Sequence, residues 1–289
     1  METLKVYFCD FWNEFEKDED FISPILKKHF NLVLTKNKPD VLFHSIFNQM
    51  KEARTIPCKK RIVYLGENWR PGQFGANYSI SFDPHSETNF RLPLWQVYLL
   101  NKPELKDRLY ERRRLETFER FCSFTVSNSS NMMRNGFFQQ LNQYKRVHSY
   151  GKVLPNDFTL QQLSVPGKYW RDVKDEFFLN HTHKFSIAFE NTNFPGYTTE
   201  KLMDAFLAGS LPIYSGNPQI AREFNPNAFI YPFKGKSLND VFEMVKEVDV
   251  NENLFKVMYN EPVFTPEQKQ DLETNLSGFE TWLIDIIKK

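Results

Sequence analysis

The residues best suited to chemistry lie in one stretch, residues 184–216, which reads KFSIAFENTNFPGYTTEKLMDAFLAGSLPIYSG. An apolar segment with the pattern of a buried strand precedes a turn and then a helix that Thr198 or Thr199 can cap. The first turn of that helix holds Glu200 and Lys201. A helix N-terminus offers free N–H groups and a partial positive charge, which together with the Lys201 ammonium suit a phosphate. The oxygens of Glu200, turned away from that phosphate, can accept hydrogen bonds from sugar hydroxyls.

Together these groups predict one nucleotide-binding site. Glu200 is expected to bind ribose and Lys201 the diphosphate, while Tyr197 and Asn191 close over the ligand. The alternative is that Glu200 only complements the helix dipole and that Lys201 is a solvated charge. These two residues by themselves do not decide between the two interpretations.

Two further segments place a charged residue after a predicted strand. SFTVSN, from Ser123, leads through a Ser/Asn-rich turn into a helix that carries Arg134, and a planar guanidinium matches a pyrophosphate. In YLGENW, Glu67 follows Gly66 at a strand end, where we expect its carboxylate to project into a cleft. Taken alone, such an arginine is more often a surface ion-pair partner, and such a glutamate a capping or turn residue.

An α/β framework is needed to bring these residues together. Apolar runs that predict strands begin near Leu4, Asp40, Arg61, Tyr78, Ser123, Lys184, Leu211 and Ala228. Helical spacing occurs between many of them, for example in residues 131–144, 198–209 and 237–248. Strands that alternate with helices indicate parallel sheets, whose ligands bind beyond the carboxyl ends of the strands.

The domain organisation is predicted from a polar segment, residues 156–180, which is interrupted by Pro-Gly and separates two α/β groups. We therefore expect an N-terminal α/β domain over residues 1–160, a C-terminal α/β domain over residues 161–270, and a terminal helix over residues 271–289.

The terminal helix has its own start signals, since Thr265 can cap it and Pro266 suits its first turn. Its apolar residues cluster at Phe279, Trp282, Leu283, Ile286 and Ile287. This pattern favours a helix docked on a domain, and a weak peripheral membrane anchor is the alternative.

Composition restricts the partners. The 289 residues include 37 Lys plus Arg and 36 Asp plus Glu, so the net charge of +1 attracts neither nucleic acid nor an acidic membrane. The run KDRLYERRRLETFER, residues 106–120, interleaves acids with bases and predicts a solvated helix rather than a nucleic-acid-binding stripe.

Three widely spaced cysteines indicate buried thiols in a reducing compartment. No signal-like or spanning apolar run is evident, so we expect a cytoplasmic protein.

The stretch from Phe185 to Pro218 resembles the signature segment of the α-1,3/4-fucosyltransferases, with its F-E-N run, its aromatic-x-T-E-K run and its Pro-[IV]-x-x-G element. FTVSNSSNMMRNGF is similar to the family's S-N-x…R-x-x-F segment, and YLGENW to the strand ending in G-E-N of bacterial members. SISFD…FRLPLW resembles their D-Y-x-I-x-F-D…R-x-P-L stretch. These segments cover most of residues 60–265 and resemble Helicobacter-like members of glycosyltransferase family 10.

The resemblance implies a GT-B architecture, in which two Rossmann-like domains face each other across a cleft and a helical segment follows. It implies that the N-terminal domain binds the acceptor and the C-terminal domain binds the donor. It implies an inverting transfer of fucose from GDP-β-L-fucose to the 3-OH of GlcNAc in N-acetyllactosamine-type acceptors. The product would be of Lewis x type, made for cell-surface polysaccharide or lipopolysaccharide O-antigen. A GT-B transferase with another nucleotide-sugar donor, or with α-1,4 linkage specificity, is the alternative.

The resemblance also implies roles for seven residues. They are Glu67 as the general base, Arg134 and Lys201 as diphosphate ligands, Glu200 as the ribose or donor-sugar ligand, Asn191 and Tyr197 as donor-site lining, and Glu190 as the F-E-N glutamate, whose role is donor binding or structural. Because none of these candidate residues belongs to a DxD motif that could hold a divalent ion, we expect no metal or other cofactor to be required. The expected partners are GDP-fucose and a glycan acceptor, with no nucleic acid and at most weak peripheral attachment to the inner face of the bacterial inner membrane.

Overall fold

The computed structural model describes residues 1–289 except 13, 14, 16, 18, 19, 164–168 and 233–235. The chain forms two compact units, each with its own parallel sheet. Unit 1 comprises Met1–Pro103 and Gln270–Lys289, and unit 2 comprises Glu104–Lys269.

This division differs from the boundary near residue 160 that the sequence suggested. The strands β7 (Arg120–Phe124) and β8 (Val147–Ser149) lie in the same sheet as β9 (His183–Phe189), so they already belong to unit 2. The polar segment that suggested a boundary contains α5 (Thr159–Gln162) and α6 (Trp170–Asn180), and residues 164–168 of it lie outside the described residues.

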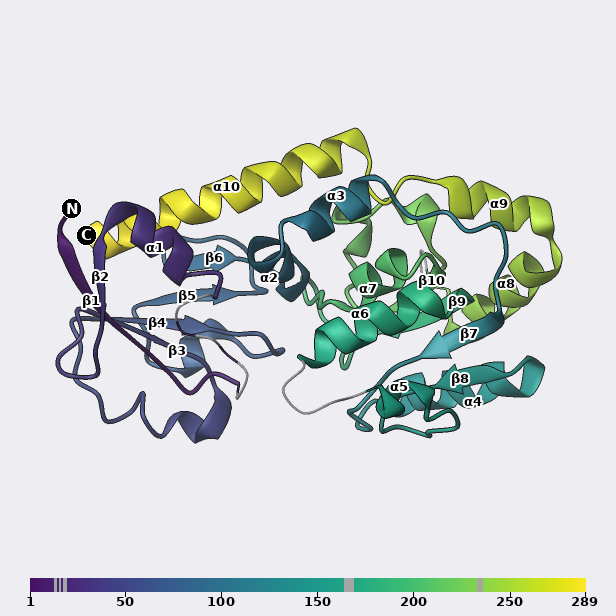
Figure 1. The fold of residues 1–289 in the computed structure, drawn as a ribbon, viewed down its shortest axis with the longest axis horizontal. Helices are drawn as coiled ribbons and strands as arrows, with labels where there is room; N and C mark the ends of the chain where they lie inside the picture. Colours follow the sequence, from purple (N-terminus) through teal and green to yellow (C-terminus); the bar gives the residue numbers. More distant parts are fainter. Residues whose placement is uncertain (13–14, 16, 18–19, 164–168, 233–235) are drawn as a thin grey trace. The chain divides into compact units, whose positions relative to one another are not determined.

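Unit 1 is built on six parallel strands in the order β2-β1-β3-β4-β5-β6. Their bounds are β1 Thr3–Cys9, β2 Asn31–Leu34, β3 Val41–His44, β4 Lys60–Tyr64, β5 Tyr78–Ser81 and β6 Asn89–Arg91. The helices are α1 (Ser23–His29), α2 (Leu94–Asn101) and α10 (Pro266–Lys288), with the short 3-10 turns η1 (Phe47–Met50) and η2 (Pro71–Gln73). Figure 1 shows α1 and α10 on the same side of this sheet, where their apolar residues share one core.

Helix α10 starts and packs as the sequence predicted. It begins at Pro266, and Thr265 and Gln268 bond each other's backbone N–H groups, which satisfies two donors of the first turn. Phe279, Leu283 and Ile286 are buried in the core of unit 1. The docked-helix interpretation is therefore confirmed, because the apolar face of α10 is covered by its own chain.

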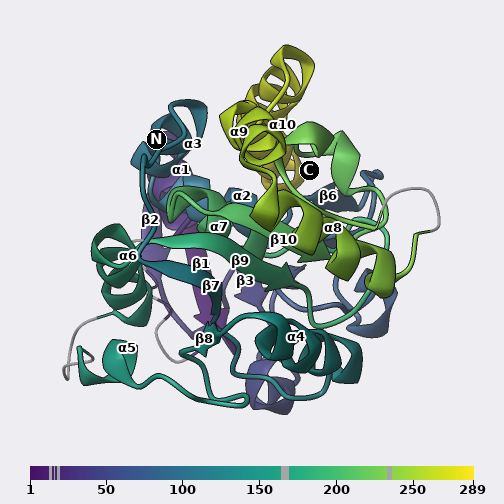
Figure 2. The same ribbon diagram turned by 90° about the vertical axis from the view of Figure 1, so that its right-hand side faces the viewer.

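Unit 2 is built on four parallel strands in the order β10-β9-β7-β8, with β10 at Leu211–Ser215. Besides α5 and α6, its helical segments are α3 Glu104–Tyr110, α4 Met132–Tyr144, α7 Lys201–Leu207, α8 Leu238–Val250, α9 Glu252–Asn260, η3 Ile220–Arg222 and η4 Pro226–Ala228. Figure 2 shows α4 and α8 on one side of this sheet and α6 on the other. Side chains of α4, α8 and α9 complete an apolar core with one face of the strands.

The run AFIYPF, expected to be a strand, forms only an isolated bridge between Ile230 and Ile213. It is followed by residues 233–235, which lie outside the described residues. Conversely, β2, β6 and β8 were not anticipated from their short sequences.

The basic run at residues 106–120 is not the solvated helix that its charges suggested. Helix α3 ends at Tyr110, and Arg112, Arg113 and Arg114 each donate hydrogen bonds to backbone carbonyls of unit 2. The guanidinium groups of Arg112 and Arg114 also lie over the Tyr259 ring, at 4.9 and 5.6 Å from its centroid. These arginines attach the connecting segment to unit 2, which explains why the helix stops before them.

All three cysteines are free thiols; Cys9 and Cys122 are buried and Cys58 is partly buried. Throughout the described ranges of the chain, we find no helix with the length and apolar character needed to cross a bilayer.

Candidate functional site

The strand β9 ends beside a completely buried carboxylate, Glu190. Thr199 donates to it twice, from its backbone N–H at 2.7 Å and from its hydroxyl at 2.6 Å. The Nζ atom of Lys201 lies 3.4 Å from Glu190 Oε2 and donates to Thr199 Oγ1 at 2.9 Å. Burial raises the pKa of Glu190, although Lys201 acts to lower it. Glu190 therefore anchors the turn that leads into α7.

The neighbouring strand β10 approaches Glu190 so closely that only glycine fits at its end. A Cβ atom on Gly216 would lie 2.4 Å from Glu190 Cγ and 2.7 Å from the Tyr214 hydroxyl. The Glu190 N–H also donates to the Ser215 carbonyl at 2.8 Å. The position of the carboxylate is thus fixed from both sides.

The predicted cap of α7 is wrong. The helix begins at Lys201, and the residue at its N-cap position is Glu200, without a capping hydrogen bond from its side chain. The Thr199 hydroxyl bonds Glu190, and the Thr198 hydroxyl donates to Glu223 at 2.9 Å. Both threonines bind carboxylates, the buried Glu190 and the partly exposed Glu223, instead of the helix end. The predicted stop is confirmed, since Gly209 takes a φ of +75° directly after the last turn.

The start of α4 is joined to the end of β9. Asn131 caps α4 by accepting from the Arg134 N–H at 3.0 Å, and its amide donates to the Glu190 carbonyl at 2.9 Å. The Arg134 side chain is completely buried and donates to the Phe189 carbonyl at 3.2 Å, to Asn191 Oδ1 at 2.9 Å and to the Asn128 carbonyl. Burial lowers the pKa of Arg134. The guanidinium thus braces the loops that follow β7 and β9.

The side chains of Glu200 and Lys201 are accessible, with 22% and 18% of their surface exposed and 3.5 Å between Oε1 and Nζ. Burial acts to raise the pKa of Glu200, but Lys201 and Lys174 lower it to about 2. Glu200 is therefore a carboxylate at neutral pH.

The six predicted residues of unit 2 form two layers. Arg134, Glu190 and Tyr197 have no exposed surface, whereas Asn191, Glu200 and Lys201 are partly exposed. The structure thus brings the six residues together at the carboxyl end of β9, but only the second layer offers surface to a ligand in this conformation.

The seventh residue, Glu67, belongs to unit 1. It lies on the exposed loop after β4, where its carbonyl accepts from the Trp69 N–H at 2.7 Å. This is the carboxyl end of a parallel strand, the edge at which the sequence placed it.

Sequence reasoning missed a charged cluster between α6 and α7. Arg171 and Lys174 on α6 both bind Asp204 on α7. This cluster borders a pocket of unit 2. The polar residues that line the pocket include Ser123, Thr125, Lys174, Asp175, Ser186, Glu200, Lys201 and Asp204. The signal that could have revealed α6 was the pair of bases three residues apart in a segment that was interpreted as a linker.

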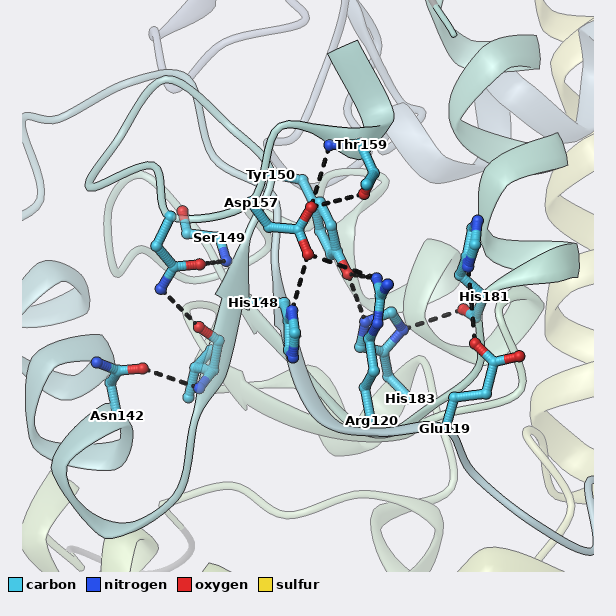
Figure 3. Close-up of polar contacts among 12 residues, drawn as sticks. Glu119, Arg120, Asn142, His148, Ser149, Tyr150, Asp157, Thr159, His181 and His183 are labelled. Atoms are coloured by element: carbon cyan, nitrogen blue, oxygen red, sulfur yellow. Dashed lines mark hydrogen bonds and ion pairs between the residues drawn. The ribbon is translucent and has the colours of Figure 1, made fainter. Parts of the chain in front are cut away.

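A second polar network lies at the opposite end of the strands, where β7 and β9 begin (Figure 3). Arg120 donates to the Tyr150 hydroxyl and lies 3.6 Å from Asp157. The Tyr150 hydroxyl is 2.9 Å from Nε2 of the buried His183, and His148 is 2.9 Å from Asp157. Because parallel strands place ligands at their carboxyl ends, we assign this network to structure.

Among the residues that the structure describes, no group of three or more His, Cys, Asp or Glu side chains is placed to hold a metal ion.

The chain consists of two units, and each is a parallel sheet with helices and with polar residues beyond the strand ends. This is a glycosyltransferase fold of the GT-B type, so the fold prediction is confirmed. Residues 6–98 match the model of the Alpha-(1,3)-fucosyltransferase FucT N-terminal domain, and residues 116–267 match that of the Glycosyltransferase family 10 (fucosyltransferase) C-terminal region. The chain belongs to glycosyltransferase family 10. Both matched ranges fall on their own side of the boundary between the two units.

The chain is similar to several known proteins. It is 26% identical to the Alpha-(1,3)-fucosyltransferase FucT of Helicobacter pylori, over 95% of this chain and 63% of that protein. It is 29% identical to the human 4-galactosyl-N-acetylglucosaminide 3-alpha-L-fucosyltransferase 9, over 56% of this chain and 40% of that protein. A crystal structure of an alpha1,3-fucosyltransferase with GDP-fucose matches with a TM-score of 0.70 at 24% identity, over 98% of this chain and 91% of that one. The chain spans less than two thirds of the length of these two sequence relatives.

Proposed function

We propose that the protein transfers fucose from GDP-β-L-fucose to a glycan hydroxyl, with inversion at the anomeric carbon. The observation that carries this proposal is the cluster after β9, where the accessible Lys201 lies close to both Glu200 and the buried Glu190. The buried Arg134 braces the loops around this cluster. Membership of glycosyltransferase family 10 supports the donor, since the relatives named above are fucosyltransferases.

The two layers of the donor site have different roles. Lys201, with its ammonium at the surface, binds the diphosphate directly, and Glu200 accepts hydrogen bonds from the ribose or fucose hydroxyls. Asn191 and Tyr197 line the site, Asn191 at its surface and Tyr197 beneath it. Arg134 contributes buried positive charge and holds the loops in place.

Leaving-group stabilisation is the main electrostatic task of this reaction. Cleavage of the anomeric C–O bond leaves positive charge on the sugar ring and negative charge on the departing diphosphate. Preorganised donors such as the Lys201 ammonium stabilise that negative charge, each contributing about 2.7–4 kcal/mol if it acts like an oxyanion contact. No divalent ion is required in this scheme, so treatment with EDTA should leave most of the activity.

The acceptor hydroxyl attacks from the face opposite GDP and loses its proton as the new bond forms. We assign the proton to the carboxylate of Glu67, which lies after a strand of unit 1. The β-linked fucose of the donor becomes α-linked in the product. A retaining enzyme would produce the other anomer, so the stereochemistry of the product tests this assignment.

For the acceptor we propose the 3-OH of GlcNAc in N-acetyllactosamine-type glycans, which gives a Lewis x-type product. The support is the name of the human relative, a 4-galactosyl-N-acetylglucosaminide 3-alpha-L-fucosyltransferase. We propose that the product serves cell-surface polysaccharide or lipopolysaccharide O-antigen, and that the enzyme works in the cytoplasm, at most weakly attached to the inner membrane.

The deciding experiment incubates the purified protein with GDP-fucose and a set of type 1 and type 2 disaccharides, and assigns the linkage of each product by NMR. A parallel panel of other nucleotide sugars tests the donor. We expect an α-1,3 product on type 2 acceptors from GDP-fucose only. Turnover with another donor, or an α-1,4 product on type 1 acceptors, would support the alternative transferases instead.

A further inference from the structure

Helix α6 presents two cations to one carboxylate of α7. Arg171 Nη2 lies 2.5 Å from Asp204 Oδ1, and Lys174 Nζ binds Asp204 Oδ2. The side chains of Arg171, Lys174 and Asp204 are only 5%, 15% and 17% exposed. Each carboxylate oxygen therefore has its own cation in a largely water-free setting, unlike a mobile surface ion pair.

Asp204 is one helical turn beyond Glu200, and its backbone N–H donates to the Glu200 carbonyl at 2.8 Å. Residues four apart lie on the same face of a helix, so Glu200 and Asp204 face the same neighbour. Both of them line the pocket that Lys174 and Lys201 also line. The contact between α6 and Asp204 thus lies on the same side of α7 as the Glu200 carboxylate.

The local charge balance explains why these cations matter. Lys201 has two carboxylates close by, Glu190 at 3.4 Å and Glu200 at 3.5 Å. An anion that approached this ammonium would meet a local excess of negative charge unless other cations faced the same carboxylates. Lys174 and Arg171 supply that charge, and both act to keep Glu200 ionised. Two further charged groups line the same pocket, Arg108 of α3 and Asp175 of α6, and Arg171 Nε lies 3.9 Å from Asp175 Oδ2.

We propose that Lys174 and Arg171 are positioning residues for the donor, which hold α7 through Asp204 and draw the Glu200 carboxylate toward α6. The Lys201 ammonium is thereby left to bind the diphosphate. This inference rests on the proposed function, because it assumes that a guanosine diphosphate binds beside Lys201. It adds α6 to a site that otherwise consists of the segments after β7 and β9.

The test is calorimetric titration of the full-length protein with GDP over a range of pH. Lys174→Met should weaken GDP binding at neutral pH by about tenfold, or about 1.4 kcal/mol. Lys174→Arg should restore most of the affinity, since a guanidinium also fits a carboxylate. Lys246→Met is the matched control, because Lys246 pairs with Glu243 on the exposed face of α8.

The pH profile separates positioning through charge from mere packing. Wild-type affinity should not depend on Glu200 above about pH 4, because Lys201 and Lys174 lower the pKa of Glu200 to about 2. In Lys174→Met the loss of affinity that accompanies protonation of Glu200 should begin at a higher pH than in the wild type, because one of the cations that keep Glu200 ionised is gone. Should Lys174→Met not fold, Lys174→Gln keeps a hydrogen-bond donor for Asp204 without the charge and should behave in the same way.

The outcomes distinguish this inference from the proposed function. Wild-type protein that binds no GDP would overturn both. Wild-type binding with unchanged affinity and pH profile in the Lys174 variants would overturn only the role of α6. Loss of affinity without a changed pH profile, and without rescue by arginine, would show a purely structural contact and would also overturn the inference.

Discussion

Replacement of His183 by glutamine is expected to remove much of the acid sensitivity of unit 2. His183 is 1% exposed, and its Nδ1 lies 3.0 Å from the His181 carbonyl, which can only accept, so the hydrogen-bond network assigns the proton to Nδ1. Nε2 must then accept from the Tyr150 hydroxyl, which in turn accepts from Arg120 (Figure 3). A proton added at Nε2 would face another donor in a buried position.

The magnitude follows from the pKa of the imidazole. Burial, with the charges of Arg120 and His148, lowers the pKa of His183 from 6.5 to about 3. Below pH 6.5 the unfolded chain binds a proton at His183, whereas the folded chain does not. The contribution of His183 to the free energy of unfolding is therefore fully present above that pH and is lost as the pH falls toward 3. The loss is about 1.4 kcal/mol per pH unit within this window, which gives about 2 kcal/mol between about pH 7 and pH 5.

The assay is urea unfolding of the wild type and of His183→Gln at both pH values. The fall in the free energy of unfolding should be about 2 kcal/mol larger in the wild type, because every other group titrates equally in the two proteins. His181→Gln is the control: its ring is 35% exposed, and its backbone carbonyl remains available to His183. NMR titration of the His183 ring should show no ionisation between about pH 8 and 5.

Two results would refute this reasoning. One is an equal pH dependence of stability in the wild type and His183→Gln. The other is a His183 ring that titrates near its ordinary pKa in the folded protein, since the chain of donors through Tyr150 could not then be as described.

Two further predictions concern the site. Glu67→Gln should lower turnover about a hundredfold while leaving GDP affinity unchanged in calorimetry; near-normal turnover would remove Glu67 from the mechanism. Gly216→Ala should destabilise the protein by about 1–3 kcal/mol in urea unfolding, because the new methyl group would collide with Glu190. Gly136→Ala in α4 is its control, with open space around the added carbon and an expected gain of up to about 1 kcal/mol; equal effects of the two changes would contradict the close approach of β10.

The sequence predicted most of the framework because its central strands are apolar and bounded by turn residues. The strands that it did not reveal are β2, β6 and β8, which are three or four residues long and lie at sheet edges. An edge strand is covered on fewer sides, so it needs fewer apolar residues and leaves a weaker pattern. The predicted domain boundary near residue 160 differs from the division after Pro103 because β7 and β8 pair in the same sheet as β9, and such long-range strand pairing leaves no local pattern in the sequence.

The sequence also predicted the six candidate site residues of unit 2, because their types and order resemble a family signature. It could not separate the buried layer from the accessible one, since that depends on how closely β10 and α4 approach Glu190. Nor could it find the pairing of Lys174 with Asp204, which joins residues thirty positions apart through tertiary packing.

The position of α10 has a consequence for the order in which the protein is made. Phe279, Leu283 and Ile286 complete the core around β1, so this strand must wait for residues of α10, which are synthesised much later. Unit 2 is one continuous segment, Glu104–Lys269, and all of it emerges before those residues do. During synthesis, therefore, the second unit can finish folding while the first is still incomplete, the reverse of the usual N-to-C order.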